Sequence, residues 1–407
     1  MKICILTTSY PTWREKRDEF MRGKFVHDMA KYLVKAGADV HVVTPNDADN
    51  ECCEHRDGVV IHRFHYFLKS HETLTKGSGI PENIKKPFNK LLVPFFLFFL
   101  ILNASQIIRK NNIAVINAHW GFPTGYIGLL LKRILKRKLV ITLYGAELFP
   151  YVKSGNGFIR YFLKSAIRRA DAIAGISDAT VRAANEISGR DDIVVIPDGI
   201  DTAYYIPGRK NLAILSKYGC SNSKTIFFTG RMVERKGHRT VLEAMETQRL
   251  KNMNVKLLLG GNGPLFQTLY DLRSRMNLEE CVHMPGFLPE DELVPILQSV
   301  DLHVLPSCVD SNGDTEGSAT AAFEAMACGT PSIVSRIGGN EGAIENGKGA
   351  FYFEAGNSPN LAEIIVKLMD DQVLLERAKR EARKFIEDNY SWEASVTRYF
   401  RLIGKMY

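Results

Sequence analysis

Residues 225–247 read TIFFTGRMVERKGHRTVLEAMET, and the order of residue types in them indicates the fold class. Its first five residues are a short apolar run typical of a buried parallel strand, Gly230 marks a turn, and 237–247 has the apolar spacing of a helix. The same order of strand, turn and helix recurs along both halves of the chain. Because neighbouring parallel strands need a long connection, this alternation predicts parallel sheets with crossover helices.

The expected elements fall into two sets, separated by a junction at 197–208 that is rich in Pro, Gly and Asp. In the first half we expect a helix at Phe20–Ala36 and strands at Lys2–Thr7, Asp39–Thr44, Ile113–Asn117, Leu139–Leu143, Ala172–Ile176 and Ile193–Ile196. In the second half we expect strands at Thr225–Thr229, Val255–Leu259, Val282–Met284, Leu302–Leu305 and Ser332–Ser335. Helices are expected there at Gly237–Thr247, Pro264–Met276, Pro289–Gln298, Ala319–Ala327 and Pro359–Asp370.

These patterns predict an α/β protein of two doubly wound, Rossmann-like domains that face each other across a cleft. The first domain would span 1–199 and the second 200–390, with a C-terminal helix at 391–407 packing back on the first domain. A chain of 407 residues is long enough for two such cores. With 45% hydrophobic and 24% charged residues, it does not have the composition of a disordered chain or a polytopic membrane protein.

The cysteines and the N-terminus predict a cytoplasmic protein. The seven cysteines are scattered and form no CxxC pair, so reduced thiols are the simplest interpretation. Only Ile3–Leu6 follows Lys2 before polar residues begin, which is too short for the apolar region of a signal peptide.

The net charge of +8 is concentrated in the first half. Residues 1–200 carry 29 Lys and Arg against 19 Asp and Glu, whereas the remainder of the chain has a small excess of acidic residues. A basic half indicates an anionic partner, such as a nucleic acid, a membrane surface or a phosphorylated substrate.

The stretch from Leu305 to Glu345 carries the most specific chemistry. Glu316 lies in a Gly-flanked loop after an expected strand, and Glu324 lies one to two turns inside the next helix. The helix start near Gly317–Thr320 offers free backbone N–H groups and the positive end of a helix dipole, which together suit a phosphate. Two carboxylates on either side of such a helix start can hydrogen-bond sugar hydroxyls at both ends of a diphosphate.

This stretch resembles the signature of retaining nucleotide-sugar glycosyltransferases of family 4, which have the GT-B fold. The longer loop at 308–315 is similar to that of exopolysaccharide and colanic-acid-type members. The resemblance implies that the second domain binds the donor and the first domain the acceptor. It also implies that Glu316 faces the donor sugar, that Glu324 binds the nucleotide ribose, and that the helix start contributes Gly317, Ser318 and Ala319 to the donor site.

Two further motifs agree with the resemblance. Arg231 and Lys236 are five residues apart between a strand and a helix, so both could converge on one anion. The resemblance places this pair on the donor diphosphate, where fixed cations would stabilise the charge on the leaving group. It places a glycine-rich loop beside the nucleobase, formed by Gly260, Gly261, Asn262 and Gly263.

The first half departs from the family pattern in two places. The loop Ser9–Gly23 is charged and bulky, so we expect it to recognise the acceptor rather than approach a ligand through its backbone. Many members carry a His near the reacting carbon where this chain has Tyr144, which is a poor base near neutral pH. His119 matches another family position, at a strand end that faces the cleft. His119 and Tyr144 are the candidate catalytic residues of this half, and the identity of any catalytic base stays open.

We expect no cofactor and no essential metal. The sequence Asp47-Ala48-Asp49 could hold a metal in another glycosyltransferase fold, but it lies in a loop rich in Asn and Asp, far from the motifs of the second half. A solvated turn is the simpler interpretation of this loop.

The run Leu91–Leu102 is apolar on all sides, which is typical of either a buried helix or a helix at a membrane surface. It is shorter than the roughly 20 residues of a spanning helix. Basic residues on both sides favour anionic lipid headgroups. They are Lys85, Lys86 and Lys90 before the run and Lys132, Arg133, Lys136, Arg137 and Lys138 beyond it.

The function expected from the resemblance is transfer of a sugar from a UDP- or GDP-sugar to a hydroxyl of a glycan or lipid-linked glycan in cell-surface polysaccharide biosynthesis. The enzyme would act in the cytoplasm or on the inner face of the cytoplasmic membrane. One alternative is a UDP-sugar 2-epimerase of the same architecture. Another is a non-enzymatic nucleic-acid-binding protein, which the basic half favours, although no recognisable nucleic-acid module is present and we expect no nucleic-acid partner.

Overall fold

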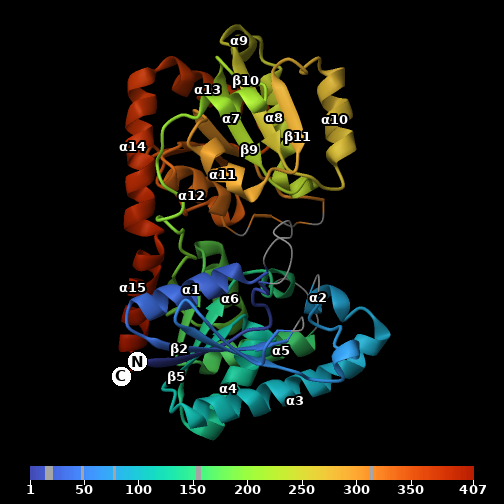
Figure 1. Cartoon of the computed structure of the whole chain (residues 1–407), viewed down its shortest axis with the longest axis vertical. Helices are drawn as coiled ribbons and strands as arrows, with labels where there is room; N and C mark the ends of the chain where they lie inside the picture. Colours follow the sequence, from blue (N-terminus) through green and yellow to red (C-terminus); the bar gives the residue numbers. More distant parts are fainter. Residues whose placement is uncertain are drawn as a thin grey trace. The chain divides into compact units, whose positions relative to one another are not determined.

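The structure is a computed structural model that describes residues 1–13, 22–46, 50–76, 79–152, 157–311, 313, 315–316 and 318–407. The chain divides into two compact units (Figure 1). The first comprises Met1–Gly199 and Ser395–Tyr407, and the second comprises Ile200–Ala394. The chain therefore passes from one unit to the other twice, after Gly199 and after Ala394.

The sheet of the first unit has the strand order β3-β4-β2-β1-β5-β6-β7-β8. All pairs are parallel except β3 with β4, which form an antiparallel pair at one edge. Its strands are β1 (Lys2–Leu6), β2 (Asp39–Pro45), β3 (Cys53–Arg56), β4 (Val59–Phe64), β5 (Val115–His119), β6 (Lys138–Leu143), β7 (Ala172–Gly175) and β8 (Val194–Val195).

The sheet of the second unit has the order β11-β10-β9-β12-β13-β14 and is parallel throughout. Its strands are β9 (Lys224–Thr229), β10 (Val255–Gly260), β11 (Val282–Gly286), β12 (Leu302–Leu305), β13 (Ser332–Ser335) and β14 (Ala350–Phe353).

Helices connect the strands in both units. In the first part of the chain they are α1 (Lys24–Lys35), α2 (Ile80–Asn83), α3 (Pro87–Lys110), α4 (Tyr126–Leu135), α5 (Gly157–Arg169) and α6 (Asp178–Ser188). The second unit contains α7 (Leu212–Lys217), α8 (His238–Met245), α9 (Gln248–Asn252), α10 (Phe266–Arg275), α11 (Glu290–Leu297), α12 (Thr320–Ala327), α13 (Ser358–Asp370) and α14 (Gln372–Asn389). The last helix, α15 (Trp392–Gly404), returns the chain to the first unit.

The two Rossmann-like sheets confirm the fold class, and the expected strands are present with shifts of one or two residues at their ends. The strand expected at Ile113–Asn117 begins at Val115 and continues to His119, which brings His119 into the sheet. Strands β3, β4 and β14 were not expected from the sequence. The four residues of β3 are polar and mostly exposed, so they carry no apolar run by which the strand could be found.

Both faces of the first sheet are buried, which explains why its strands are almost continuously apolar. Cys4 and Leu6 of β1 belong to a buried cluster with residues of α3, α4 and α5. Ile3 and Ile5 are equally buried but point the other way, because side chains alternate along a strand. Figure 1 shows α1 on that other face of the sheet.

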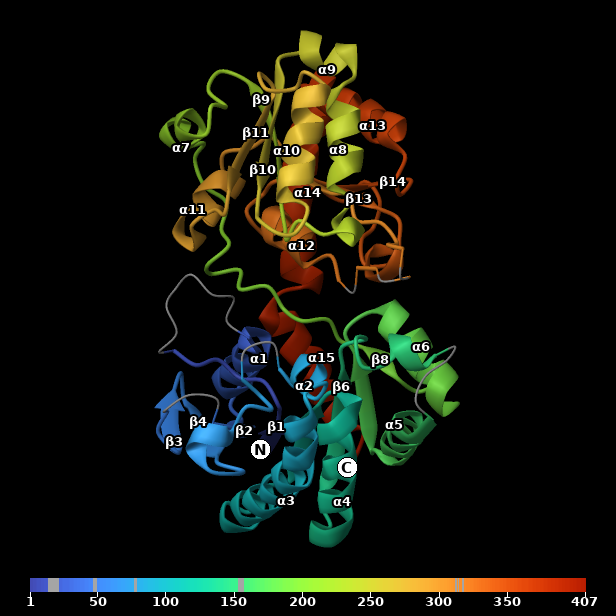
Figure 2. The ribbon, with the colours of Figure 1, turned by 90° about the vertical axis from the view of Figure 1, so that its right-hand side faces the viewer.

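The second sheet is covered in the same way. Phe228 of β9 lies in a cluster with residues of α8, α10 and α13, whereas its neighbour Phe227 lies in a cluster with residues of α7 and α11. Figure 2 shows α8 and α10 in front of this sheet. Strands buried on both faces leave their carboxyl ends as the place for polar chemistry, as is usual in doubly wound folds.

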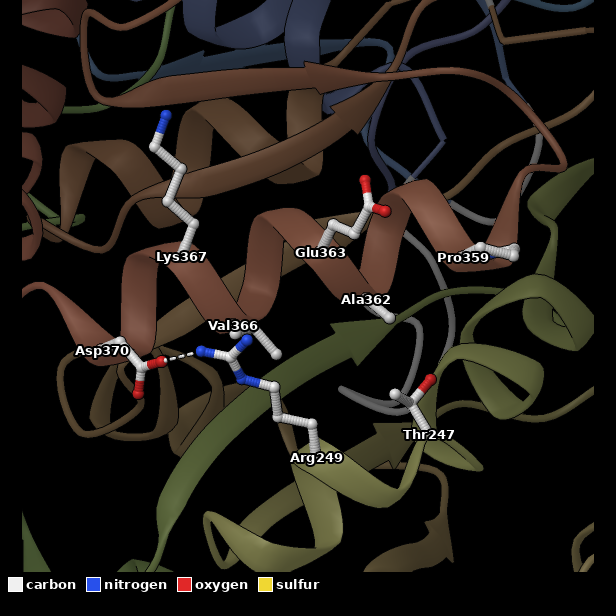
Figure 3. Close-up of a pocket in the computed structure, with 8 residues that line it drawn as sticks. All are labelled: Thr247, Arg249, Pro359, Ala362, Glu363, Val366, Lys367 and Asp370. Carbon is white, nitrogen blue, oxygen red and sulfur yellow. Dashed lines mark hydrogen bonds and ion pairs between the residues drawn. The ribbon is translucent and has the colours of Figure 1, made fainter.

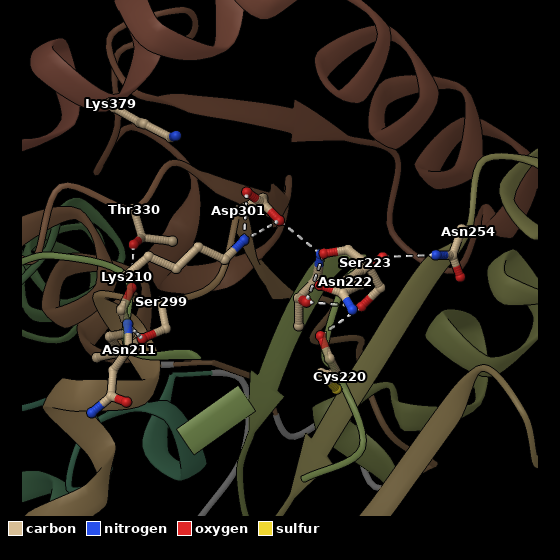
Figure 4. A network of polar contacts seen from close by, with 12 residues as sticks. Lys210, Asn211, Cys220, Asn222, Ser223, Asn254, Ser299, Asp301, Thr330 and Lys379 are labelled. Atoms are coloured by element: carbon tan, nitrogen blue, oxygen red, sulfur yellow. Dashed lines mark hydrogen bonds and ion pairs between the residues drawn. The ribbon is translucent and has the colours of Figure 1, made fainter. Parts of the chain in front are cut away.

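Polar contacts fix the entry of the chain into the second sheet (Figure 4). Asp301 accepts a hydrogen bond from the backbone N–H of Thr225 at 2.8 Å, and its carboxylate lies 3.5 Å from the Lys210 ammonium. The backbone N–H of Asn211 donates to the Ser299 hydroxyl at 2.9 Å. These bonds tie the segment before α7 to the starts of β9 and β12.

Helix α3 has two apolar faces with different surroundings. It lies beside α4 (Figures 1 and 2). One face is buried in the first unit and includes Leu92, Phe96, Leu100, Ala104 and Ile108. The other face leaves between 39% and 62% of each side chain exposed and includes Phe88, Leu91, Phe95, Phe98 and Leu102.

In length and composition, α3 would also suffice to cross a membrane, although a core helix of a soluble protein can meet the same test. About 28% of its most apolar window is buried. Burial in the protein core therefore applies to one side of Leu91–Leu102. The opposite side is exposed, and contact of that side with a membrane surface stays a prediction.

Candidate functional site

The carboxylate of Glu316 lies at the carboxyl end of the second sheet and has partners on three side chains. The Lys236 ammonium lies 2.6 Å from its Oε2, and the Ser307 hydroxyl donates to the same oxygen at 3.0 Å. The Arg235 guanidinium lies 3.6 Å from Oε1. Glu316 is only 8% exposed, so these partners compensate a carboxylate that has lost most of its water.

The packing of two loops brings these residues together. Strands β9 and β12 are neighbours in the sheet, so the residues that follow them emerge side by side. After β9 the short turn Glu234–Lys236 ends at Gly237, whose φ is 67°. A Cβ at Gly237 would lie 1.9 Å from the carbonyl oxygen of Pro306, so this position requires glycine.

The backbone of Glu316 is also fixed. The N–H of Gly339, in the loop after β13, donates to the Glu316 carbonyl at 2.7 Å. The placement of this carboxyl group is therefore set by three separate loops of the second unit.

The cation that joins Lys236 beside Glu316 is Arg235, which the sequence analysis did not single out. Arg231, which it paired with Lys236, lies exposed at the start of the same segment. Spacing along the chain does not show which of the three cations of this segment reach Glu316, because the conformation of the turn decides it. The convergence of Arg231 and Lys236 on a diphosphate stays a prediction.

The start of α12 lies close by in the chain. Ala319 is the N-cap residue and is fully buried, and no side chain caps the first turn. The Thr320 hydroxyl donates to the Ser318 hydroxyl at 3.3 Å. Gly317 lies outside the described residues. Glu324, farther along α12, accepts a hydrogen bond from the Tyr205 hydroxyl at 2.9 Å, a partner that the sequence analysis missed.

The glycine-rich loop packs against the segment that precedes Lys236. The N–H of Met232 donates to the Asn262 carbonyl at 2.9 Å, and a Cβ at Gly261 would lie 2.1 Å from the Gly230 carbonyl oxygen. Close approach of two backbones therefore explains the small residues here without any ligand. The expected contact of Gly260–Gly263 with a nucleobase stays a prediction.

In the first unit, His119 and Tyr144 lie at the carboxyl ends of β5 and β6 and form one chain of hydrogen bonds. The Thr142 hydroxyl donates to Asn117 Oδ1 at 3.1 Å, and Asn117 Nδ2 donates to His119 Nε2 at 3.2 Å. This leaves His119 Nδ1 to donate to the Tyr144 hydroxyl, 2.6 Å away. The proton of the Tyr144 hydroxyl is then directed away from His119.

His119 is the last residue of β5, as expected, but its side chain does not reach the surface. Its side chain is fully buried, and burial lowers its pKa to about 3. Tyr144 is the half-buried member of the pair, with its ring 5.2 Å from that of Trp120 and 4.8 Å from that of Phe25. Tyr144 is therefore the member of this chain of hydrogen bonds that is accessible from the surface.

Carboxyl groups near Tyr144 have raised pKa values. Burial raises the pKa of Asp198 to about 7, with a further contribution from Asp28. Burial also raises the pKa of Glu147, whose carboxylate accepts the backbone N–H of Tyr144 at 3.0 Å. Burial, and then the charge of Asp198, hold the pKa of Tyr144 well above its usual value, so Tyr144 is a hydrogen-bond donor rather than a base.

Only the beginning and end of the loop Ser9–Gly23 are described, and Arg14–Met21 lies outside the described residues. Two successive side-chain hydrogen bonds, which were not expected from the sequence, hold the beginning of the loop. The Tyr10 hydroxyl lies 2.7 Å from His27 Nδ1, and His27 Nε2 lies 2.9 Å from Asp57 Oδ2. The role of this loop in acceptor recognition stays a prediction.

No metal centre is apparent in the part of the chain that the structure describes. These residues contain no group of three or more His, Cys, Asp or Glu side chains that could hold a metal ion. The sequence Asp47-Ala48-Asp49 lies outside them.

A separate hollow of about 570 Å³ lies between α13 and the segment around α9 (Figure 3). Arg249 and Asp370 pair across it at 2.7 Å, and both side chains are exposed. None of the candidate site residues lines this hollow, so it is not part of the candidate site.

Comparison with known proteins gives two family matches that together cover most of the chain. Residues 216–385 match the family Glycosyl transferases group 1, and residues 23–204 match Glycosyltransferase Family 4. This chain belongs to glycosyltransferase family 4 and has the GT-B fold. The two Rossmann-like units of this family 4 glycosyltransferase are the two domains of that fold.

Individual relatives of this family 4 glycosyltransferase are distant in sequence. N-acetyl-alpha-D-glucosaminyl L-malate synthase of Bacillus anthracis is 24% identical over 81% of this chain and 88% of its own. WcaL of Escherichia coli, named for colanic acid biosynthesis, is 25% identical over 72% of this chain and 71% of its own. The structure of HepE from Anabaena in complex with UDP covers all of both chains with a TM-score of 0.72 at 19% identity.

Burial of His119 should make the stability of this family 4 glycosyltransferase depend on pH. The pKa of His119 is about 3 in the folded protein, against about 6.5 for an ordinary histidine. The unfolded chain therefore binds more protons between these values, and the free energy of unfolding falls as the pH falls below about 6.5. His119→Asn should reduce this slope by up to about 1.4 kcal/mol per pH unit.

The measurement is the free energy of urea unfolding of the full chain between pH 4.5 and 7.5. The same substitution at the exposed His71 is the control. Equal slopes for the wild-type protein and His119→Asn would show that His119 does not stay neutral in the folded protein.

Proposed function

We propose that this chain is a retaining glycosyltransferase. It would transfer a sugar from a UDP- or GDP-sugar to a hydroxyl of a glycan or lipid-linked glycan in cell-surface polysaccharide biosynthesis. The observation that carries the proposal is the carboxylate of Glu316 held between Lys236, Arg235 and Ser307 in a family 4 chain. Similar proteins support it: a structure of HepE is in complex with UDP, and the name of WcaL refers to colanic acid biosynthesis.

The donor would bind to the second unit through its diphosphate and ribose. When the bond between the sugar and the diphosphate breaks, negative charge develops on the leaving oxygen. Lys236 and Arg235, and Arg231 on the same segment, are cations suited to stabilise that charge. Glu316 would orient the sugar, Glu324 would bind the ribose, and the loop Gly260–Gly263 would lie beside the base.

The proposed chemistry keeps both reacting bonds on one face of the sugar. The bond from the sugar carbon to the leaving phosphate oxygen breaks, a bond to the acceptor oxygen forms on the same face, and the acceptor proton passes to the leaving phosphate. A protein base at position 144 is then not required. This agrees with Tyr144 as a fixed hydrogen-bond donor, its hydroxyl oriented by the uncharged ring of His119.

Glu316→Gln and Lys236→Ala should each reduce turnover by at least about 10²-fold, because each removes one member of the charged cluster. The assay is the rate of sugar transfer with donor and acceptor, with thermal melting as a check that the variants fold. The exposed Glu363 provides a matched control, and Glu363→Gln should retain full turnover. Full turnover in both cluster variants would remove these residues from the mechanism.

Conversion of the sugar nucleotide to its epimer without any acceptor would instead identify a 2-epimerase.

Chelation of divalent metals should leave transfer unchanged, because Lys236 and Arg235 already provide positive charge where the diphosphate would lie. The measurement is the transfer rate after dialysis against EDTA. A loss of activity that Mg²⁺ or Mn²⁺ restores would contradict a metal-independent reaction.

We also propose that the exposed face of α3 docks the enzyme on the inner face of the cytoplasmic membrane, beside a lipid-linked acceptor. The apolar side chains of this face recur every three or four residues along more than half of the helix. No Asp or Glu occurs between Glu82 and Glu147, whereas this stretch contains ten Lys and Arg residues. An exposed apolar stripe within a wholly basic stretch suits an anionic bilayer, because each cation near the surface contributes about 1 kcal/mol of attraction to it.

Seven unpaired cysteines agree with a cytoplasmic location.

Replacing Leu91 and Phe98 by Ser should abolish flotation of the protein with vesicles that contain anionic lipid, because both side chains are about 60% exposed on the proposed docking face. The wild-type protein should float at low salt with anionic vesicles and remain unbound with neutral ones. Val373→Ser is the control, since Val373 is 82% exposed on α14. Absence of wild-type flotation at low salt would contradict the docking proposal.

A further inference from the structure

We propose that Tyr205 is a positioning residue that orients the carboxylate of Glu324 for the donor ribose, and that Arg383 holds Tyr205 in place. This inference rests on the proposed function, in which Glu324 binds the ribose. It adds two residues that the sequence motifs did not include.

The contact between Tyr205 and Glu324 is direct. The Tyr205 hydroxyl donates to Glu324 Oε1 at 2.9 Å, although the two residues are 119 positions apart in the chain. A hydrogen bond to a carboxylate is stronger than one between neutral groups and restricts its orientation. Burial and the nearby Glu324 charge both raise the pKa of Tyr205, so the hydroxyl keeps its proton and remains a donor.

A flexible Glu side chain needs such a restraint. Glutamate has several freely rotating bonds, and a carboxylate on the surface of a helix samples many orientations. With Oε1 bonded to Tyr205, the plane of the carboxyl group is restricted before any nucleotide arrives. Binding of the ribose hydroxyls then costs less conformational entropy, which appears as tighter binding.

Arg383, on α14, connects the segment that carries Tyr205 to the helix that carries Glu324. Its Nη1 donates to the carbonyl of Tyr205 at 2.7 Å and to the carbonyl of Ala327, the last residue of α12, at 2.8 Å. Its Nη2 donates to the carbonyl of Thr202 at 3.1 Å. One planar guanidinium group therefore fixes the Tyr205 backbone relative to α12, and the Tyr205 hydroxyl completes a closed loop of contacts through Glu324.

The ring of Tyr205 has a packing role that can be separated from its hydroxyl. It packs against the buried cluster that contains Phe323 and Met326 of α12 and against the cluster that contains Cys328. Phenylalanine would keep these apolar contacts and remove only the hydrogen bond. Tyr205→Phe is therefore the variant that isolates the proposed role.

The neighbouring Tyr204 provides a matched control. Its ring lies 5.0 Å from that of Tyr205, and its side chain is 47% exposed. Tyr204→Phe removes a hydroxyl from the same segment, so it controls for any general effect of losing a tyrosine there.

The experiment measures the dissociation constants of UDP and GDP by calorimetry, together with KM for the donor and kcat. For the nucleotide that binds, Tyr205→Phe should weaken affinity about 10-fold and raise the donor KM by a similar factor, as expected for the loss of one charge-assisted hydrogen bond, and kcat should change less than about twofold. Tyr204→Phe should match the wild-type protein. The 2′,3′-dideoxy form of the same nucleotide lacks the ribose hydroxyls, so wild type and Tyr205→Phe should bind it equally.

The outcomes separate this inference from the function on which it rests. If Glu324→Gln binds the ribonucleotide as tightly as the wild-type protein, the ribose role of Glu324 fails, and the positioning role fails with it. If Glu324→Gln weakens binding but Tyr205→Phe does not, only the positioning role of Tyr205 is overturned. Equal weakening of the ribonucleotide and the dideoxy nucleotide by Tyr205→Phe would also overturn it, because the effect would then not pass through the ribose.

Arg383→Lys tests the second part of the inference. Lysine keeps the charge but cannot bond three carbonyl groups in the geometry of a guanidinium. This variant should weaken binding of the ribonucleotide selectively over the dideoxy form, as Tyr205→Phe does. A lower melting temperature with unchanged selectivity between the two nucleotides would show that Arg383 only stabilises the fold.

Discussion

The ion pair between Glu316 and Lys236 is the interaction on which the second unit depends. A carboxylate that is 8% exposed is costly unless its charge and its hydrogen-bonding capacity are both satisfied. Lys236 and Ser307 satisfy them from loops that follow two neighbouring strands, and these loops can approach only because Gly237 has no side chain. The close packing of the two loop backbones is therefore what brings the charged groups of the site together.

The two units follow the same rule with different chemistry. In each, the carboxyl ends of adjacent parallel strands bring polar side chains together, as doubly wound sheets generally do. The second unit gathers cations around a carboxylate, which suits an anionic ligand. The first unit places the uncharged His119 beneath Tyr144, with the carboxyl groups of Asp198 and Glu147 nearby, and such hydrogen-bonding groups suit the hydroxyl groups of a sugar.

Much of the fold could be predicted from the sequence, because strands buried on both faces are short apolar runs and the helices between them have a clear apolar spacing. Of the three strands that escaped prediction, the exposed Cys53–Arg56 at a sheet edge has no apolar run, whereas Val59–Phe64 and Ala350–Phe353 do contain apolar residues. The motifs led to Glu316 and Lys236, which the structure places in contact. Arg235 was missed because the motif paired Lys236 with Arg231, and spacing along the chain does not show which cations the turn brings to Glu316. Tyr205 was missed because its partner is 119 residues away, and no local pattern records such a contact.

The most direct test is a crystal structure of the full chain with a bound nucleoside diphosphate. The diphosphate oxygens should lie within hydrogen-bond distance of Lys236 or Arg235, and the ribose hydroxyls against the carboxylate of Glu324. A nucleotide bound away from these residues, with the Glu316–Lys236 pair undisturbed and remote from it, would contradict the proposed donor site.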